Sequence, residues 1–283
     1  MKKTLMIAAV LALIISGCEK PLVEDLESVG DADGNVLLTV AANETRSVPV
    51  GEVCTRLNVA VFDGGGTKVK AVGQSSAESG FGNVRLSLPE GNYKLVVVGH
   101  NGTGSATITN VEKVTFPNNK VTDTFLYFGT LTVTGETQEL AITLTRCVAM
   151  LRLILEDSGG DSDIASLKFY YLGGSSTLSP LSGYGCVNSK QTEYRAWNEE
   201  GIYKLYTIPH TAADVLTRLT ITAYDASDNV VGEWTLTDIP LGMNRVTEYT
   251  GDLFNGSGGS GESTYSSGIL VDAEWDGVDS YTF

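Results

Sequence analysis

Features of catalytic and nucleic-acid-binding proteins are scarce in this 283-residue chain. There are only two histidines, His100 and His210, and neither has a partner at the spacing of metal ligands, so a zinc site is not expected. A Gly-x-Ser-x-Gly elbow is missing, which weakens a serine-hydrolase interpretation. Lys and Arg total 19 against 34 Asp and Glu, a net charge of −15, and no basic stripe exists to bind phosphates. We expect no cofactor, no metal and no nucleic-acid partner.

Long apolar runs are also missing beyond the first residues, so no later segment is expected to cross a membrane. Cysteine is rare. Apart from Cys18, the chain has Cys54, Cys147 and Cys186, an odd number that allows at most one bond within the chain. Cys147 stands in an apolar alternating run, which favours a small buried side chain over a nucleophile or ligand.

The amino terminus carries the most informative motif. Lys2 and Lys3 precede a short apolar stretch that ends in Leu13-Ile14-Ile15-Ser16-Gly17-Cys18, the pattern of a lipobox. This predicts a lipoprotein signal peptide over residues 1–17 and a mature chain that begins at a lipidated Cys18. Two or more acyl chains on that thiol would give durable anchoring. The acidic residues that follow predict a tether over residues 18–34 and, in a diderm bacterium, delivery to the outer membrane.

Strand patterns dominate the next part of the chain. Short β-rich or alternating runs occur from residue 36 and are separated by turn sequences such as Asp63-Gly64-Gly65-Gly66. The run 93–98 is continuously apolar, which predicts a central strand covered on both faces. The strands expected in this first half are 36–40, 57–61, 69–72, 84–88, 93–98, 125–128, 131–134 and 139–145.

The pattern restarts near Arg146, and we place the boundary between two domains there, at 35–145 and 146–283. Further strands are expected at 148–155, 167–172, 202–208, 219–224, 230–236 and 246–249. Only residues 211–216 could form a helical turn, so the fold class is all-β, with sandwich domains. Residues 255–268 are rich in Gly and Ser and are interpreted as a linker to a terminal strand within 269–283, with Ile269 to Trp275 as its pattern.

Two loops resemble ligand-binding motifs only superficially. The glycines around His100 lack the residues that complete a nucleotide loop, and we interpret them as a turn. The segment 31–35 has aspartates like a calcium loop, but its glycine is misplaced and no closing glutamate follows, so an Asx turn is expected.

The order of several segments resembles the FimB-type fimbrial anchor and fimbrillin lipoproteins of Bacteroidota, the subunits of type V pili. The likeness spans nearly the whole mature chain. It is carried by segments 54–62, 88–97, 144–152, 183–188 and 249–254 and by the tryptophan-bearing terminal strand, together with the lipobox. The resemblance implies two tandem transthyretin-like Greek-key β-sandwich domains, a lipid anchor in the outer membrane, and a non-catalytic role in seating or ending a fimbria.

Strand exchange is the physical counterpart of that role, because an incomplete sandwich offers unpaired backbone groups to a partner's extended segment. Fimbrial shaft subunits are the expected partners. Two segments of this chain are candidates for exchange, unless each completes its own sheet: one contains Val36, Leu38 and Val40, and the other contains Ile269, Val271 and Trp275.

Alternative functions remain open on the sequence. In relatives that polymerise, a protease cuts after an arginine that follows the first strand, and Arg46 stands at such a position, which fits a processed stalk or tip fimbrillin. A surface glycan-binding lipoprotein would use aromatic side chains such as Trp197 and Tyr194 as a stacking platform. A glycosidase would need two carboxylates close together in a cleft, and 34 acidic residues leave that pairing open.

Overall fold

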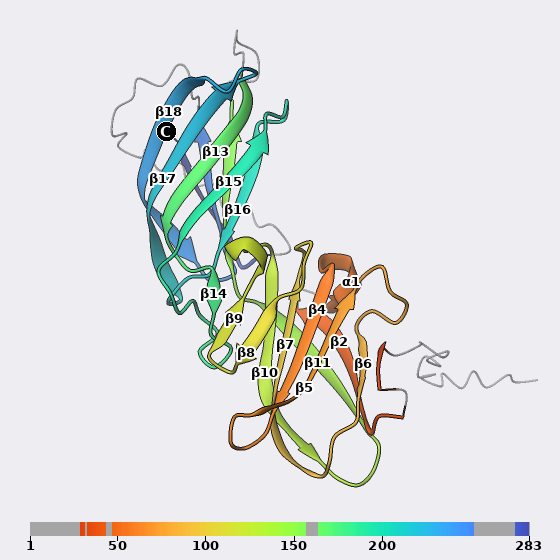
Figure 1. Cartoon of the computed structure of the whole chain (residues 1–283). Coiled ribbons are helices and arrows are strands. Elements are labelled where there is room, and N and C mark those ends of the chain that lie inside the picture. Colours follow the sequence, from red (N-terminus) through yellow and green to blue (C-terminus); the bar gives the residue numbers. More distant parts are fainter. Residues whose placement is uncertain (1–28, 32, 44–46, 157–163, 252–274, 283) are drawn as a thin grey trace, which may run out of the picture.

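The computed structural model describes residues 29–31, 33–43, 47–156, 164–251 and 275–282, and these residues are almost entirely β-structure (Figure 1). The helices of this part are one turn of α-helix, α1 (Val50–Val53), and a short 3-10 turn, η1 (Pro117–Asn119). No helix in the described ranges is long and apolar enough to span a bilayer. The predicted all-β fold is confirmed.

The amino-terminal half is a sandwich whose two layers belong to one bent sheet. The sheet order is β1-β6-β2-β11-β10-β7-β4-β5, and β11 meets β10 at only two residue pairs, so the sheet folds over at that corner. β3 pairs with β2 off this path. The strands are β1 (Val29–Gly30), β2 (Val36–Asn43), β3 (Ser47–Pro49), β4 (Arg56–Phe62), β5 (Lys68–Ser75), β6 (Asn83–Leu86), β7 (Gly91–His100), β10 (Thr124–Val133) and β11 (Gln138–Arg146).

Apolar side chains at alternate positions of the strands fill the space between these layers. Val36, Leu38 and Val40 of β2 face Leu57 and other apolar residues of β4, β7 and β10 in a first core. Strand β7 confirms the prediction of a central strand, because Leu95 to Val98 are all 0% exposed. Its odd residues belong to the first core and its even residues to a second core on the other face.

The carboxy-terminal half consists of two separate four-stranded sheets with a third core between them. One sheet has the order β16-β12-β19-β20, and the other has the order β15-β13-β17-β18. Their strands are β12 (Ala149–Leu155), β13 (Ile164–Gly173), β15 (Lys190–Ala196), β16 (Ile202–Thr207), β17 (Ala213–Asp225), β18 (Val230–Gly242), β19 (Val246–Gly251) and β20 (Val278–Thr282).

The two halves repeat one strand order. Each half has a layer that reads β6-β2-β11 or β16-β12-β19, and a layer that reads β10-β7-β4-β5 or β18-β17-β13-β15. In both, the first strand pairs in parallel with the last, β2 with β11 and β12 with β19. Strand β20 has no counterpart in the described residues of the first half. It is therefore an addition to a sandwich topology that is already complete.

A small three-stranded sheet and the second core join the halves. β8 (Thr107–Asn110) and β9 (Lys113–Thr115) come from the first half, and β14 (Thr177–Leu178) from the second half pairs with β9 (Figure 1). The buried carboxylate of Glu193 accepts from Tyr171 Oη at 3.0 Å and lies 3.3 Å from Lys120 Nζ of the first half. Side chains of both halves thus share one apolar core and one ion pair.

Residues 211–216, the one segment whose sequence could form a helical turn, form none; most of them belong to a strand. Strand β17 begins at Ala213, and Leu216 is buried in the third core while it pairs with Ile239 of β18. Two β-branched residues, Val215 and Thr217, flank Leu216 and suit this extended backbone. Strands β8, β9, β14 and β15 were not predicted. In β15 the inward residues Gln191 and Glu193 are polar, so their burial leaves no apolar alternation in the sequence.

Gly99 of β7 lies where the first core leaves no room for a side chain. A Cβ at this position would meet Cys54 Sγ and Leu144 Cδ1, each at 2.9 Å. We expect Gly99→Ala to lower the free energy of unfolding by about 1–3 kcal/mol, because an overpacked core must shift. Urea denaturation measures the change. Gly64→Ala, where no atom lies within 4 Å, is the matched control; equal stability of the two variants would contradict the packing.

Candidate strand-docking site

The first predicted exchange segment is an integral strand in the middle of a layer. Strand β2 pairs in parallel with β11 along its whole length, from Val36–Gln138 to Asn43–Thr145. On its other side it pairs with β6 and then with β3. Val36, Leu38 and Val40 are 0–4% exposed in the first core. This strand completes its own sheet in the structure, and its exchange with a partner stays a prediction.

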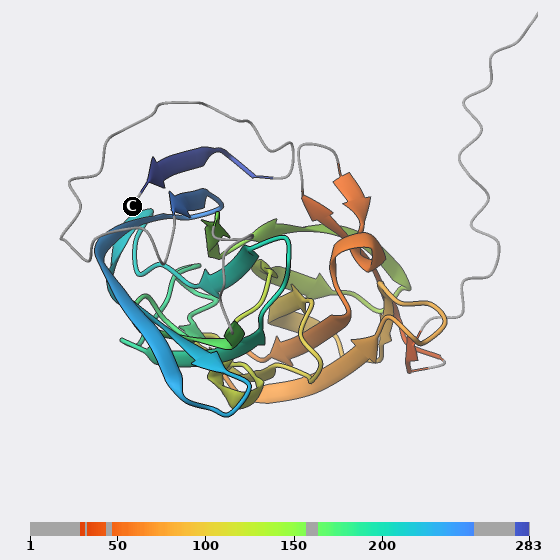
Figure 2. The same ribbon diagram turned by 90° about the horizontal axis from the view of Figure 1, so that it is seen from above.

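The carboxy-terminal segment lies at the edge of a sheet. Strand β20 runs parallel to β19, with Val246 opposite Val278 and Thr250 opposite Thr282. Figure 2 shows it as the outermost ribbon beside β19, and its other edge pairs with no strand among the described residues. A parallel strand that follows residues 252–274 has the geometry of β-augmentation, supplied here by the same chain.

Three side-chain contacts fix the register of β20. Arg245 donates two hydrogen bonds to the Asp279 carboxylate, at 2.9 and 3.1 Å, and this contact raises the pKa of the guanidinium. Tyr249 and Tyr281 stack with ring centroids 4.8 Å apart. Ser280 Oγ donates to Glu248 at 3.4 Å. Ladder hydrogen bonds alone are sequence-independent, whereas these contacts require particular residues of the docked strand.

Trp275 connects the same segment to the junction between the halves. It is buried in the second core, and the guanidinium of Arg146 lies 4.1 Å from the centroid of its ring. Phe125 covers the other side of Arg146 at 4.6 Å. Asp123 accepts two bonds from Arg146, at 2.7 and 3.1 Å, so the buried charge is both paired and stacked.

The residues that contact the Arg146 side chain, here called the Arg146 cluster, come from three parts of the chain. Asp123 and Phe125 belong to the first half, and Asn244, which accepts from Arg146 Nη1 at 3.3 Å, precedes β19 in the second. Trp275 belongs to the carboxy-terminal segment. The Asp276 amide donates to the Asn244 carbonyl at 2.9 Å, which brings that segment onto the same loop.

Several predicted site residues lie outside the described residues. These are Cys18, Arg46, Ile269 and Val271, together with the proposed linker 255–268. Trp275 is described, and it precedes the strand instead of belonging to it, because β20 starts at Val278. The roles predicted for all of these residues stay predictions.

The histidines do not form a catalytic pair. His100 ends β7, is 1% exposed, and accepts a bond from the Gly102 amide at Nδ1. Burial and, to a smaller extent, the charge of Arg56 lower its pKa to about 4. A cavity of about 180 Å³ lies beside it. His210 pairs with Asp214 at 2.7 Å. No cluster of metal ligands occurs within the described ranges.

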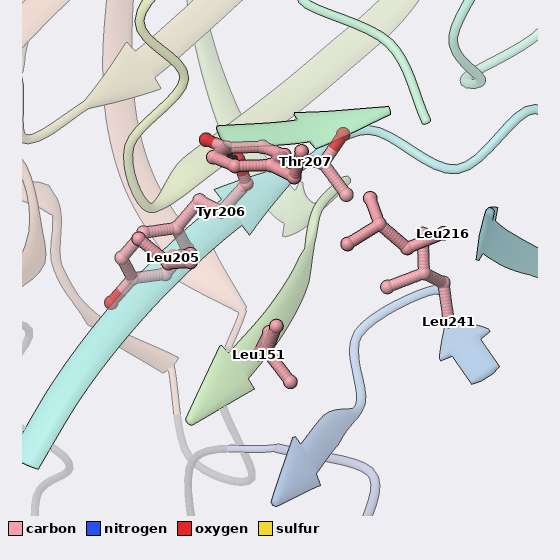
Figure 3. A pocket seen from close by; sticks show the side chains of 7 residues that line it. Leu151, Leu205, Tyr206, Thr207, Leu216 and Leu241 are labelled. Carbon is pink, nitrogen blue, oxygen red and sulfur yellow. Dashed lines mark hydrogen bonds between the residues drawn. The ribbon is translucent and has the colours of Figure 1, made fainter. Parts of the chain in front are cut away.

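The aromatic residues considered for glycan stacking lie mostly in cores. Trp197 and Trp234 pack against the third core and Trp275 is buried in the second, whereas Tyr194 is 66% exposed. Another cavity, of about 10 Å³, lies between the sheets of the second half and has room for roughly one water. Leu151, Leu205, Leu216 and Leu241 are among its lining residues (Figure 3). Trp197 is half-buried and Tyr194 exposed, and the glycan-binding alternative stays a prediction.

The three cysteines form no disulfide among the described residues. Cys54 and Cys147 are buried, as predicted for Cys147, and Cys186 is exposed. Burial raises the pKa of the Cys147 thiol far above its ordinary value, which disfavours the thiolate. At 31–35 the Gly34 amide donates to the Asp31 carbonyl at 3.1 Å, so this turn is closed by the backbone and not by the Asp31 side chain of an Asx turn. The Asp31 carboxylate instead accepts from Lys70 Nζ at 2.7 Å and from the Ser87 amide at 2.6 Å.

Sequence reasoning missed the polar partners of the docked segment. Arg146, Arg245 and Asp279 carry no motif, and their contacts join residues tens of positions apart. The only available signal was the position of Arg146 at the expected domain boundary. Charged residues at such a boundary are common, so the signal could not assign a role.

Comparison with known proteins places this fold in a family. The sequence profile described as fimbrillin-A associated anchor proteins Mfa1 and Mfa2 matches residues 27–280. The match covers most of the chain, so the chain belongs to this family of fimbrial anchor proteins. No protein with a curated description matches it.

Solved structures with similar folds share little sequence with the chain. The fimbrial anchor protein Mfa2 of Porphyromonas gingivalis is 14% identical, with a TM-score of 0.40 over 72% of this chain and 81% of that one. A fimbrial assembly protein of Parabacteroides distasonis is 14% identical, with a TM-score of 0.40 over 76% and 89%. A candidate adhesin of Bacteroides ovatus is 13% identical, with a TM-score of 0.48 over 71% and 76%.

His100 should make stability depend on pH in a defined window. Its pKa is about 4 in the folded protein and about 6.5 when unfolded, so the unfolded state binds the proton more readily. Stability should fall by up to about 3 kcal/mol as the pH drops from 6.5 to 4, and this contribution should not change further below pH 4. Urea midpoints between pH 7 and 4 measure it. His100→Gln should flatten the profile in that window; an unchanged slope would refute the assignment.

Arg146→Lys tests the stacked ion pair at the junction. Lysine keeps the charge but loses the bidentate geometry and the planar surface between two rings. We expect the free energy of unfolding to fall by about 1–3 kcal/mol in chemical denaturation. Arg218→Lys, at an exposed position of β17, is the control and should change stability by less than about 0.5 kcal/mol. Similar losses in both variants would contradict the role of Arg146.

Proposed function

We propose that this protein is a non-catalytic lipoprotein of the outer membrane, anchored through Cys18 and exposed at the cell surface, where it seats a fimbria. Fimbrial shaft subunits are its partners, and β-strand exchange is the means of binding. The family match over residues 27–280 carries the proposal. The lipobox that ends at Cys18 supplies the membrane attachment.

The terminal strands supply the physical basis for strand exchange. β20 lies at the edge of its sheet, parallel to β19, and residues 252–274 connect the two strands in the sequence. A partner strand that takes the place of β20 would make the same ladder of main-chain bonds. The deeply buried β2 favours retention of the first strand, which suits an anchor.

Processing at Arg46 would define a different position in the fibre. Arg46 lies between the end of β2 at Asn43 and the start of β3 at Ser47. A cut there would separate β2 and the lipid from the rest of the chain, as in a stalk or tip subunit. Loss of β2 would uncover the first core along Val36, Leu38 and Val40, which a neighbour's strand would then have to fill.

Mass spectrometry of the amino terminus separates these positions. We expect an acylated Cys18 on protein recovered from outer membranes. Deletion of residues 275–283 should leave that attachment and raise co-purification of shaft subunits, because it removes the strand that occupies the edge of β19. Cys18→Ala should abolish the membrane attachment and leave co-purification unchanged, because it removes only the lipid. A new terminus at Ser47 in sheared fimbriae would instead identify a processed subunit. Normal co-purification after the deletion would refute exchange at the carboxy-terminal segment.

A further inference from the structure

Strand β20 is an accessory of the fold that holds it. The first half has the same strand order as the second and forms a closed core although, among the described residues, the outer edge of β11 pairs only with β10 and only at Thr145 and Arg146. The corresponding edge of β19 is the one that β20 occupies. A sandwich of this topology therefore does not require an eighth strand, and β20 can leave without dismantling the second half.

The burial of the carboxy-terminal segment differs from that of β19. Val278 and Trp275 are buried in the second core, and Tyr281 packs partly buried against the third. In contrast, β19 is buried from Val246 to Tyr249. β19 thus belongs to the core along its length, whereas β20, its neighbour in the sheet, is buried at Val278 and half-buried to exposed beyond it.

The contacts of the segment define a recognition pattern. Trp275 stacks on Arg146, Asp279 receives two bonds from Arg245, and Tyr281 stacks on Tyr249. Gly277 is also constrained, because a Cβ there would meet Arg245 Nη1 at 2.9 Å. The recognition pattern over residues 275–281 is therefore Trp-x-Gly-Val-Asp-x-Tyr.

We propose that the edge of β19, with Arg146 and Arg245, is an exchangeable peptide-binding site, and that its ligands are extended parallel segments with an aromatic residue, an acid four positions later and a second aromatic two positions beyond. The chain's own residues 275–282 occupy the site and compete with a partner segment. The inference rests on the strand-exchange part of the proposed function and names the chemistry of the partner strand.

The chain's own segment competes intramolecularly, because residues 252–274 join it covalently to β19. A covalently linked segment can reach an effective concentration in the mM range at its site. A free peptide should therefore bind weakly to the intact chain and much more readily once the connection is cut.

Peptide exchange on the cut full-length chain tests the site. A protease recognition sequence placed within residues 252–274 allows the folded protein to be cleaved after purification. The probe is a fluorescent synthetic peptide of residues 275–283, and fluorescence anisotropy measures its binding. We expect saturable binding to the cleaved protein, at least about tenfold weaker binding to the intact one, and displacement by unlabelled peptide.

Peptide variants test the pattern. The Trp275→Ala peptide should bind about 10- to 100-fold more weakly, as expected for a buried aromatic anchor. The Asp279→Asn peptide should lose about two- to fivefold, because the pair with Arg245 is half-exposed. A scrambled peptide of the same composition is the control. A charge swap, Arg245→Asp in the protein with Asp279→Arg in the peptide, should recover affinity lost by either change alone.

Two results would overturn the inference: a segment that never leaves the cleaved protein and never exchanges, or a scrambled peptide that binds as well as the native one. The outcome is independent of the fimbrial assignment. Specific exchange in vitro, with normal shaft co-purification after deletion of residues 275–283, would retain the site and refute the proposed function. Failed peptide exchange, with co-purification that the deletion raises, would refute the recognition pattern and leave the anchor role.

Discussion

The parallel pairing of the first and last strands of each half is the constraint on which the fold depends. β2 pairs with β11, and β12 pairs with β19, so each layer closes only when residues about a hundred positions apart come together. Parallel partners cannot be joined by a tight turn, and the intervening strands must cross to the opposite layer. That crossing creates the sandwich, and the first strand of each half lies in the interior of its layer as a result.

The junction between the halves follows from the same arrangement. β11 ends at Arg146 and β12 starts at Ala149, so only a short connection separates the closing strand of one sandwich from the opening strand of the next. A guanidinium buried at this point is costly unless its charge is compensated. Asp123 supplies the charge, Phe125 and Trp275 supply the surfaces, and the carboxy-terminal segment thereby becomes part of the junction.

Sequence patterns predicted the parts of this structure that depend on local alternation. The apolar run of β7 indicated a strand covered on both faces, and Leu151, Leu153 and Leu155 indicated the inward face of β12. The patterns failed where long-range partners decide burial. Glu193 is buried because Tyr171 and Lys120 converge on it from other strands, and nothing within β15 records that convergence. The register of β20 likewise depends on Arg245 and Tyr249, so the tryptophan expected inside a strand precedes it instead.

The two candidate exchange segments differ in what their removal would expose. Withdrawal of β2 breaks ladders on both sides and uncovers apolar residues along the whole first core, so the vacated groove would demand immediate replacement. Withdrawal of the segment 275–282 breaks one ladder and leaves β19 as an edge strand whose partner β12 remains, and it also removes Trp275 from the second core and from Arg146. The two terminal strands therefore differ in how much of the fold depends on each of them.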